Sequence, residues 1–278
     1  MSNSTDRADR LNKEILEIRK QRDADYEQYK AAGRIWGLVP RERITRITFP
    51  RLPESVLSEF RGMEDLTTTV SDILDGYGIK GAVSTSHVRP IIPGKVIVGH
   101  AVTIRNIPVR KTVTKGALDK DFIAMATRDI YYLAEAGDIL VTDYAGNPDV
   151  SNMGGQSCAV AKSCGLSGSV VNGAARDIST IRRLDYPVWA VGTTNMTGKF
   201  RMECIEMNGP ISLCGLLVMP GDLVIADDSG VCVVPYDLGE IVLGECKAIL
   251  ASEEHMREMI DSKVSIEDLR PFYRKRYS

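Results

Sequence analysis

The sequence has no excess of charge of one sign, few aromatic residues and no long hydrophobic run. Its 278 residues carry 35 Lys and Arg against 37 Asp and Glu, a formal net charge of −2. Nucleic acid and anionic membranes are therefore not expected partners. Aromatic residues make up only 6% of the chain, which argues against base stacking. The apolar runs are too short to span a bilayer, and the polar N-terminus MSNSTDRADR lacks a signal-peptide core. These features predict a cytoplasmic protein.

Cysteine and histidine patterns typical of metal sites are also missing. The six cysteines form no CxxC pair, and the chain has only three histidines. Most cysteines lie in apolar stretches such as GVCVVP, which predicts buried free thiols. Hydrophobic residues at 44% and charged residues at 26% are ordinary for a globular protein with a sizeable core.

The composition changes near residue 62 and predicts two regions. Residues 1–62 are expected to form an N-terminal helical arm and linker, with a charged helix over 1–34 and a short helix near 55–60. The arm is expected to pack on the main domain or on a neighbouring subunit; a frayed tail is the alternative. Residues 63–278 are expected to form one α/β domain with a C-terminal helix.

Helix and strand patterns alternate from residue 63 onward. The expected elements are a helix capped near Thr67 or Thr68, strands in KVIVG and AVTIRNI, a helix over 118–135, a strand DILVTD ending in the turn YAGNPD, a helix over 156–164 stopped by Gly165, the strands SGSVVN and PVWAVG, and a closing helix over 237–260. The strand–helix–strand order from 138 to 172 predicts a parallel crossover. DLVIADDSGVCVVP predicts an antiparallel hairpin, so the core is expected to be mixed α/β.

The stretch GGQSCAVAKSCGLSGSVVNGAARD, residues 154–177, combines a glycine pair with a terminal Arg-Asp pair. Gly154 and Gly155 follow one predicted parallel strand and open a helix, where free N–H groups favour an anion. Arg176 and Asp177 follow the next strand, and the carboxyl ends of neighbouring parallel strands border one crevice. Arg176 can grip a carboxylate with two hydrogen bonds, and Asp177 can hold Mg²⁺ or Mn²⁺. The alternative is structural: Asp177 caps the helix that follows it.

Five pieces in the same order resemble the RraA-like family, which includes regulators of ribonuclease activity A and 4-hydroxy-4-methyl-2-oxoglutarate aldolases. The pieces are TTTVSDILDGYG, HVRPIIPGKVIVGHAVTIR, AEAGDILVTDYAG, GLSGSVVNGAARDISTIRRLDYPVWAVGTT and PGDLVIADDSGVCVVP. The resemblance covers about residues 66–260. It implies a swivelling-type β/β/α sandwich, assembled as a trimer or hexamer with sites between subunits.

The resemblance also implies a function and a set of site residues. The enzymes of the family are divalent-metal-dependent lyases that release pyruvate from a 2-oxo acid by aldol cleavage or decarboxylation. Carried over, Gly154, Gly155, Gln156, Ser157 and Arg176 would bind the substrate carboxylate. Asp177 would hold Mg²⁺ or Mn²⁺. An acidic residue of a neighbouring subunit's closing helix, Glu253 or Glu254, would complete the catalytic set.

The chain departs from the family pattern at two positions. Aldolases of the family carry Asp where this chain has Gly155, and many members carry Glu or Asp where it has Thr180. A non-catalytic regulatory or binding protein on the same scaffold is therefore the alternative function. Asp177 opposes that alternative, because the ribonuclease regulators tend to have lost it. Outside this stretch, Asp227 is expected in a hairpin turn and His100 in the core.

Overall fold

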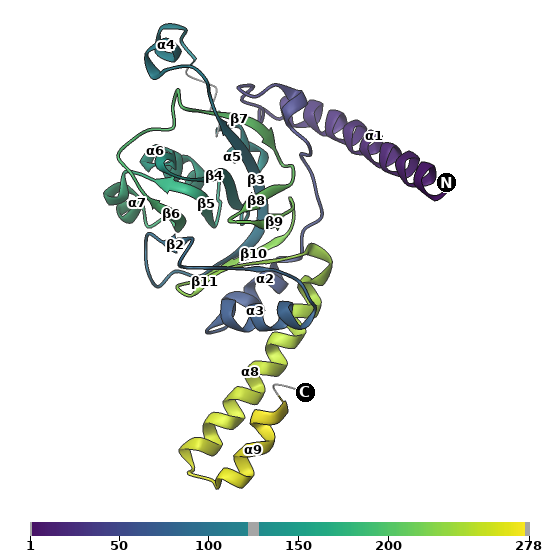
Figure 1. The fold of residues 1–278 in the computed structure, drawn as a ribbon, viewed down its shortest axis with the longest axis vertical. Helices are drawn as coiled ribbons and strands as arrows, with labels where there is room; N and C mark the ends of the chain where they lie inside the picture. Colours follow the sequence, from purple (N-terminus) through teal and green to yellow (C-terminus); the bar gives the residue numbers. More distant parts are fainter. Residues whose placement is uncertain (1, 122–127, 276–278) are drawn as a thin grey trace.

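A computed structural model of the chain describes residues 2–121 and 128–275, which form a curved mixed sheet with helices around it (Figure 1). No helix within these residues is both long and apolar enough to cross a membrane. The elements are α1 (Ser2–Ala31), η1 (Arg41–Arg43), α2 (Glu54–Arg61), α3 (Leu66–Gly76), β1 (Ala82–Ser84), β2 (Arg89–Pro90), β3 (Ile97–Pro108), α4 (Val113–Leu118), α5 (Arg128–Leu133), β4 (Ile139–Met153), α6 (Gly155–Ser163), β5 (Gly168–Ala175), α7 (Ile178–Leu184), β6 (Val188–Thr193), β7 (Met202–Met207), β8 (Ile211–Leu213), β9 (Leu216–Val218), β10 (Leu223–Ala226), β11 (Gly230–Val234), η2 (Tyr236–Leu238), α8 (Gly239–Asp261) and α9 (Ile266–Lys275).

The main sheet joins a parallel half to an antiparallel half through β3. Its strand order is β1-β11-β10-β3-β4-β5-β6-β2, with β7 also paired to β3. The pairs β3–β4, β4–β5 and β5–β6 are parallel, whereas β10 is antiparallel to both β3 and β11. The β4–α6–β5 unit is therefore a parallel crossover, which confirms the expected mixed α/β core. It also brings the ends of β4 and β5 to one edge.

Three apolar clusters hold the layers together. Helices α5, α6 and α7 pack on one face of β3–β6, and α2, α3 and α8 pack on β10, β11 and the start of β3. A third cluster lies inside the curve of the sheet, where β8, β9 and β11 cover the opposite face of β3–β6. Helix α6 therefore begins where the parallel strand β4 ends, and its inner face packs against a buried core.

The segment after α1 is tied to the domain by buried polar contacts. Arg51 forms two hydrogen bonds with Asp138, at 3.0 and 2.8 Å, and the Asp138 side chain is only 2% exposed. The Asp129 carboxylate accepts the N–H groups of residues 37–39. Near the end of α1, the Asp25 carboxylate accepts the Thr48 hydroxyl at 2.6 Å. Helix α1 itself projects away from the body (Figure 1).

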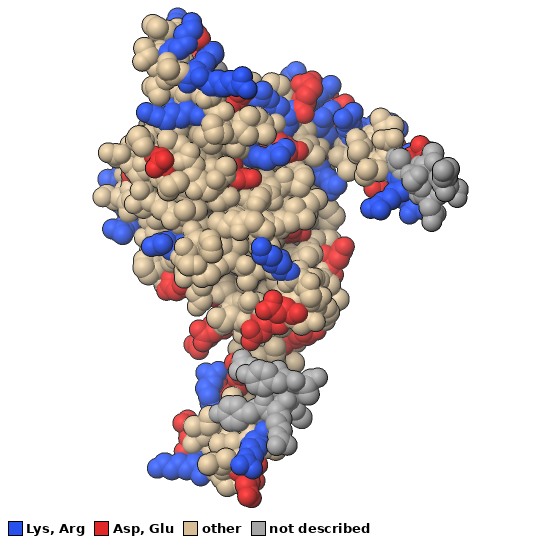
Figure 2. Space-filling model, in the orientation of Figure 1, with Lys and Arg blue, Asp and Glu red and all other residues tan. Residues whose placement is uncertain are grey.

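Charged side chains are distributed unevenly over the face drawn in Figure 2. Lys and Arg gather around α4, and Asp and Glu gather where α8 leaves the body. Part of the basic group is neutralised locally: Lys111 contacts Asp119 and Asp121, and Lys115 contacts Asp119, all within 3.0 Å.

Several expected elements are confirmed. The short helix is α2, the helix stopped by Gly165 is α6, and the 223–234 hairpin is β10–β11. Gly165 adopts φ +83° after α6, the left-handed conformation that favours glycine at a helix end. KVIVG and AVTIRNI form one strand, β3, rather than two.

Other expectations about the elements were wrong. The turn YAGNPD does not end the strand: β4 continues to Met153, and positive φ at Ala145 and Gly146 accompanies register shifts against β5. The helix expected from residue 118 is interrupted, because 119–121 are not helical; residues 122–127 lie outside the described residues. The cap of α3 is Asp65 rather than Thr67 or Thr68. Its first turn is satisfied instead by the distant Asp227 carboxylate, which accepts the Thr67 N–H at 3.0 Å.

Candidate active site

The glycine pair and the Arg-Asp pair meet at the edge where β4 and β5 end. β4 ends at Met153, Gly154 precedes α6, and Gly155 is the first residue of that helix. β5 ends at Ala175, so Arg176 and Asp177 form the link into α7. A backbone hydrogen bond from Arg176 N–H to Met153 carbonyl oxygen, 2.8 Å, joins the two links. The geometry expected from the crossover is present.

Asp177 precedes α7, but its carboxylate forms a hydrogen bond with α6. Its backbone is left-handed, with φ 58° and ψ 43°, and its side chain makes no hydrogen bond to α7. The carboxylate Oδ2 instead accepts the N–H of Gly155 at 3.0 Å. A carboxylate at a helix N-terminus is favoured by the unpaired amides and the helix dipole. The structural alternative is confirmed in position, because Asp177 is the N-cap residue of α7, but its side chain makes no cap hydrogen bond there and instead accepts the first amide of α6.

Both positions of the glycine pair are closely packed, so that an added Cβ would press on neighbouring side chains. A Cβ on Gly154 would lie 2.9 Å from Asp177 Oδ2 and 3.2 Å from Arg176 Nε. A Cβ on Gly155 would lie 2.7 Å from Thr180 Cγ2 and 3.0 Å from Thr180 Cβ. Neither glycine has positive φ, so the constraint is space and not backbone conformation. Gly155 and Thr180, the two departures from the family pattern, are thus in contact.

Arg176 presents a guanidinium at the same edge. Its side chain is 39% exposed and that of Asp177 is 45% exposed, with 3.7 Å between Arg176 Nε and Asp177 Oδ2. This distance is a loose ion pair that leaves the guanidinium fork open to an incoming carboxylate. Lysine would supply the charge without the two parallel donors. The arrangement suits a substrate with a planar acid group.

The remaining loop residues contribute unequally to an anion site. The Gly155 amide is already engaged by Asp177. The amides of Gln156 and Ser157 belong to the first turn of α6, where no helical carbonyl can accept them. The buried Tyr131 phenol of α5 lies close to this turn, where its hydroxyl donates to Met153 Sδ at 3.6 Å. Sequence reasoning missed Tyr131, because nothing in RDIYYL relates it to a loop more than twenty residues away.

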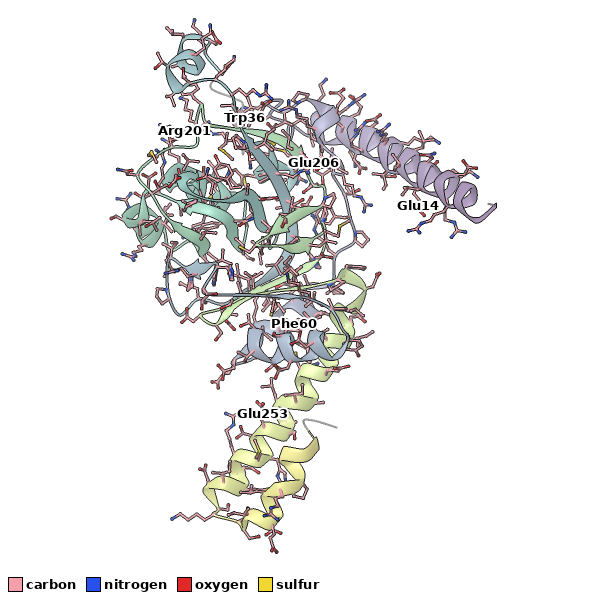
Figure 3. All side chains as sticks on the ribbon, in the orientation of Figure 1. Glu14, Trp36, Phe60, Arg201, Glu206 and Glu253 are labelled. Carbon is pink, nitrogen blue, oxygen red and sulfur yellow. The ribbon has the colours of Figure 1, made fainter. Side chains whose placement is uncertain are left out.

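Glu254 does not join this site within one chain. It lies on α8, is exposed, and pairs with Arg257 on the same helix at 3.5 Å. Figure 3 shows the adjacent Glu253 on the part of α8 that projects from the body, whereas α6 and α7 lie on the body at a different level. A role for Glu254 therefore depends on a neighbouring copy of the chain and stays a prediction.

The residues present fit a divalent cation only if one carboxylate and several waters suffice. Within the described residues there is no group of three His, Cys, Asp or Glu side chains that could hold a metal. At Asp177, Oδ2 accepts the Gly155 amide, and Oδ1 remains available on a half-exposed side chain. Mg²⁺ commonly keeps several waters and takes one or two protein carboxylates. Asp177 is compatible with such a site.

Two other titratable groups, His100 and Cys158, have structural roles. His100 donates from Nδ1 to the Gly221 carbonyl and accepts the Leu52 N–H at Nε2, both at 2.9 Å. Burial lowers its pKa from 6.5 and favours the neutral ring. Burial, with the nearby Asp177 charge, raises the pKa of Cys158 to about 12. This thiol in α6 is therefore no nucleophile near neutral pH. None of the six cysteines is in a disulfide.

The sequence model of the RraA-like family, described as Aldolase/RraA, matches residues 67–233. The chain belongs to the RraA-like family. The match includes the glycine pair, Arg176 and Asp177, whereas α1, α2, α8 and α9 lie outside it.

Similar proteins extend the match over most of the domain. The chain is 32% identical over 208 residues to the "Putative 4-hydroxy-4-methyl-2-oxoglutarate aldolase" of Halalkalibacterium halodurans, covering 75% of this chain and 90% of that protein. It is 31% identical over 204 residues to protein DlpA of Legionella pneumophila, covering 73% of this chain but only 32% of DlpA. The chain thus spans about a third of DlpA.

Solved structures share the fold. The RraA-like protein RraAS2 of Streptomyces coelicolor, described as an unusual member of the RNase ES inhibitor RraA family, has 25% identity and a TM-score of 0.64, with 76% of this chain and 99% of that chain covered. An uncharacterized protein from Pseudomonas syringae has 27% identity and a TM-score of 0.66, with 80% and 100% covered.

Proposed function

We propose that this chain is a divalent-metal-dependent lyase that cleaves a C–C bond of a 2-oxo acid or diacid and releases pyruvate. The observation that carries the proposal is the contact between the two pairs. Asp177 Oδ2 accepts the Gly155 amide at 3.0 Å, and a Cβ on Gly154 would lie 3.1 Å from Arg176 Cγ, so the two pairs are in close contact. An anion cradle and a metal-binding carboxylate then share one edge of the sheet. The name of the Halalkalibacterium halodurans relative supports an aldol substrate.

Each residue of the site has a distinct task in this proposal. Arg176 grips the substrate carboxylate with its fork, and the Gln156 and Ser157 amides add donors from the helix end. Asp177 would hold Mg²⁺ or Mn²⁺, and the bound ion would supply Lewis-acid polarisation of a substrate carbonyl oxygen. Glu254 from a neighbouring copy completes the catalytic set. The assembly proposed is a trimer or hexamer of swivelling-type β/β/α domains, in which residues 1–62 form the arm and 63–278 the domain.

The alternative is a non-catalytic regulator on the same scaffold. Two observations favour it: a single carboxylate at the edge, and a likeness to RraAS2. The lyase is preferred because Asp177 is present and its Oδ1 is available for an ion.

Asp177→Asn separates the two functions. Asparagine keeps an oxygen for the Gly155 amide but removes the charge, so the fold should persist and metal binding should be lost. We expect pyruvate release to fall by at least about 100-fold and calorimetry to detect no Mn²⁺ binding.

The matched control is Asp228→Asn. Its carboxylate accepts the Gly94 amide at 2.9 and 3.0 Å and lies outside the two pairs. This variant should bind Mn²⁺ and turn over like the parent. Unchanged turnover in Asp177→Asn would refute the lyase assignment. A parent protein that binds neither Mn²⁺ nor substrate would favour the regulator.

A further inference from the structure

The peptide group that joins Ala175 to Arg176 is held from both sides. Its N–H, which belongs to Arg176, donates to the Met153 carbonyl oxygen at 2.8 Å, and its C=O, which belongs to Ala175, accepts the Thr194 N–H at 2.9 Å. Met153 is the last residue of β4, and Thr194 directly follows β6. The backbone that carries the Arg176 side chain is therefore held between the two strands that flank β5.

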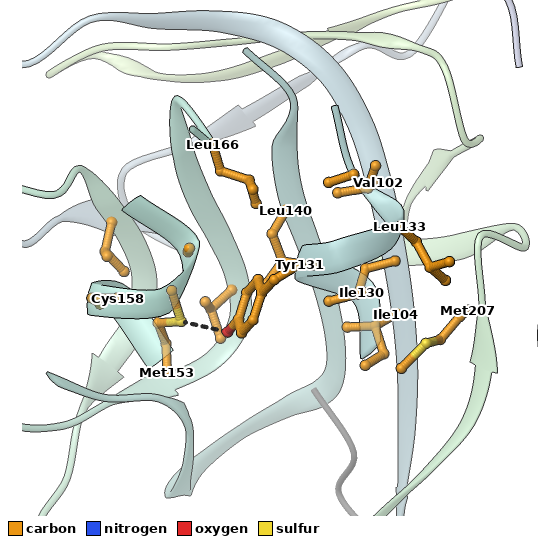
Figure 4. Packing of buried hydrophobic residues seen from close by; sticks show 14 of the residues in the cluster. Val102, Ile104, Ile130, Tyr131, Leu133, Leu140, Met153, Cys158, Leu166 and Met207 are labelled. Atoms are coloured by element: carbon orange, nitrogen blue, oxygen red, sulfur yellow. Dashed lines mark hydrogen bonds between the residues drawn. The ribbon is translucent and has the colours of Figure 1, made fainter. Parts of the chain in front are cut away.

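The two residues that hold this peptide group are supported differently. The Met153 side chain is fully buried in the apolar cluster under α6, and its Sδ accepts the Tyr131 hydroxyl at 3.6 Å, the dashed line in Figure 4. Thr194 is only half-buried and begins the loop between β6 and β7. The position of Thr194 therefore depends on its polar contacts more than on core packing.

The Thr194 hydroxyl makes hydrogen bonds to two separate segments. Its Oγ1 donates to the Asp149 carbonyl oxygen at 2.8 Å and accepts the Met196 N–H at 3.1 Å. Asp149 belongs to β4. Two backbone hydrogen bonds join the same loop to β4, because Ser151 donates to the Met196 carbonyl oxygen and accepts the Gly198 N–H, both at 3.0 Å. The hydroxyl thus ties the start of the loop after β6 to β4.

These contacts form a closed set of hydrogen bonds around the backbone of Arg176. The set runs from β4 through the Ala175–Arg176 peptide group to Thr194, and from the Thr194 hydroxyl back to β4. An arginine fork must meet a carboxylate in its plane to form two parallel hydrogen bonds. A backbone that is already fixed lowers the conformational freedom that is lost when the anion binds.

We propose that Thr194 is a positioning residue that holds the backbone of Arg176 in the orientation required to bind the substrate carboxylate. The proposal rests on the proposed lyase function for its ligand but not for its mechanics. Thr194 touches no substrate; it acts through the Ala175 carbonyl group.

The test compares Thr194→Val, which removes the hydroxyl and keeps a similar shape, with Thr194→Ser, which keeps the hydroxyl. We expect Thr194→Val to raise the KM for pyruvate release about threefold to tenfold, the effect of a lost hydrogen bond, with kcat within about twofold. Thr194→Ser should keep both constants within about twofold of the parent. The matched control is Thr197→Val, because Thr197 is half-buried in the same loop but its hydroxyl accepts the Lys199 N–H at 3.2 Å, within the loop. It should leave KM unchanged.

Amide exchange provides a readout that needs no substrate. The N–H groups of Arg176 and Thr194 should exchange faster in Thr194→Val, but at the parent rate in Thr194→Ser and Thr197→Val. If exchange responds in this way while the parent releases no pyruvate, the positioning role stands and the lyase assignment fails. If the parent releases pyruvate and Thr194→Val changes neither KM nor exchange, the inference is overturned and the lyase assignment stands. The inference is also overturned if Thr194→Ser or Thr197→Val has the same effects as Thr194→Val.

Discussion

Gly155→Ala tests whether the site depends on close contact between α6 and α7. The added Cβ would lie 2.7 Å from Thr180 Cγ2 and 3.0 Å from Thr180 Cβ, so Thr180 must move by several tenths of an ångström. Overpacking of this kind destabilises by about 1–3 kcal/mol, and alanine in a helix returns up to about 1 kcal/mol. We expect a net loss of about 1–2 kcal/mol of unfolding free energy. Pyruvate release should fall as well, because Thr180 lies in the first turn of α7, directly after Asp177.

Urea unfolding of the parent and three variants measures this directly. Adding Thr180→Ala removes the closest clashing atom, so the double variant should regain at least half of the loss. Gly244→Ala is the matched control, because it lies inside α8 and its Cβ would meet nothing within 4 Å; it should be neutral or slightly stabilising. The reasoning is refuted if Gly155→Ala is as stable as the parent, or if Thr180→Ala restores none of the lost stability.

Three further predictions concern charge. Arg176→Lys should raise KM by about tenfold or more in pyruvate-release kinetics, because a point charge replaces a bidentate fork; an unchanged KM would contradict carboxylate binding. Arg51→Met should lower the unfolding free energy in urea by about 3–5 kcal/mol, since it leaves the Asp138 carboxylate buried and unpaired, and Asp138→Asn in the same chain should recover part of this loss. Because the pKa of folded His100 is lowered from 6.5, the unfolded chain binds its proton first, so stability should fall as pH drops below about 6.5; His100→Gln should flatten this pH dependence, and an equal slope in that variant would exclude His100 as its source.

Local patterns were sufficient for those parts of the fold that depend on neighbours in sequence. The β10–β11 hairpin and the end of α6 at Gly165 follow from turn residues next to apolar runs. Long-range contacts decided the rest. β4 continues past YAGNPD because its backbone pairs with β5 again at Asn147, Ser151 and Met153 after register shifts. The first turn of α3 is satisfied by Asp227, 160 residues away.

In the candidate site, too, local patterns predicted one part and long-range contacts decided the other. The crossover predicted that Gly154–Gly155 and Arg176–Asp177 would share an edge, and the structure brings them within hydrogen-bonding distance. The partner of the Asp177 carboxylate depends on its left-handed backbone, which turns it toward α6. No sequence pattern carries that information. The contact of the Tyr131 hydroxyl with Met153 Sδ likewise arises only when α5 packs against the sheet.

Pyruvate release by the purified protein tests the central claim most directly. Oxaloacetate and 4-hydroxy-4-methyl-2-oxoglutarate would each be supplied with Mg²⁺, with Mn²⁺ and with EDTA, and Asp177→Asn would serve as the matched blank. The lyase assignment predicts release from at least one substrate, abolished both by EDTA and by Asp177→Asn. Release that survives EDTA and Asp177→Asn, or no release from either substrate, would contradict it.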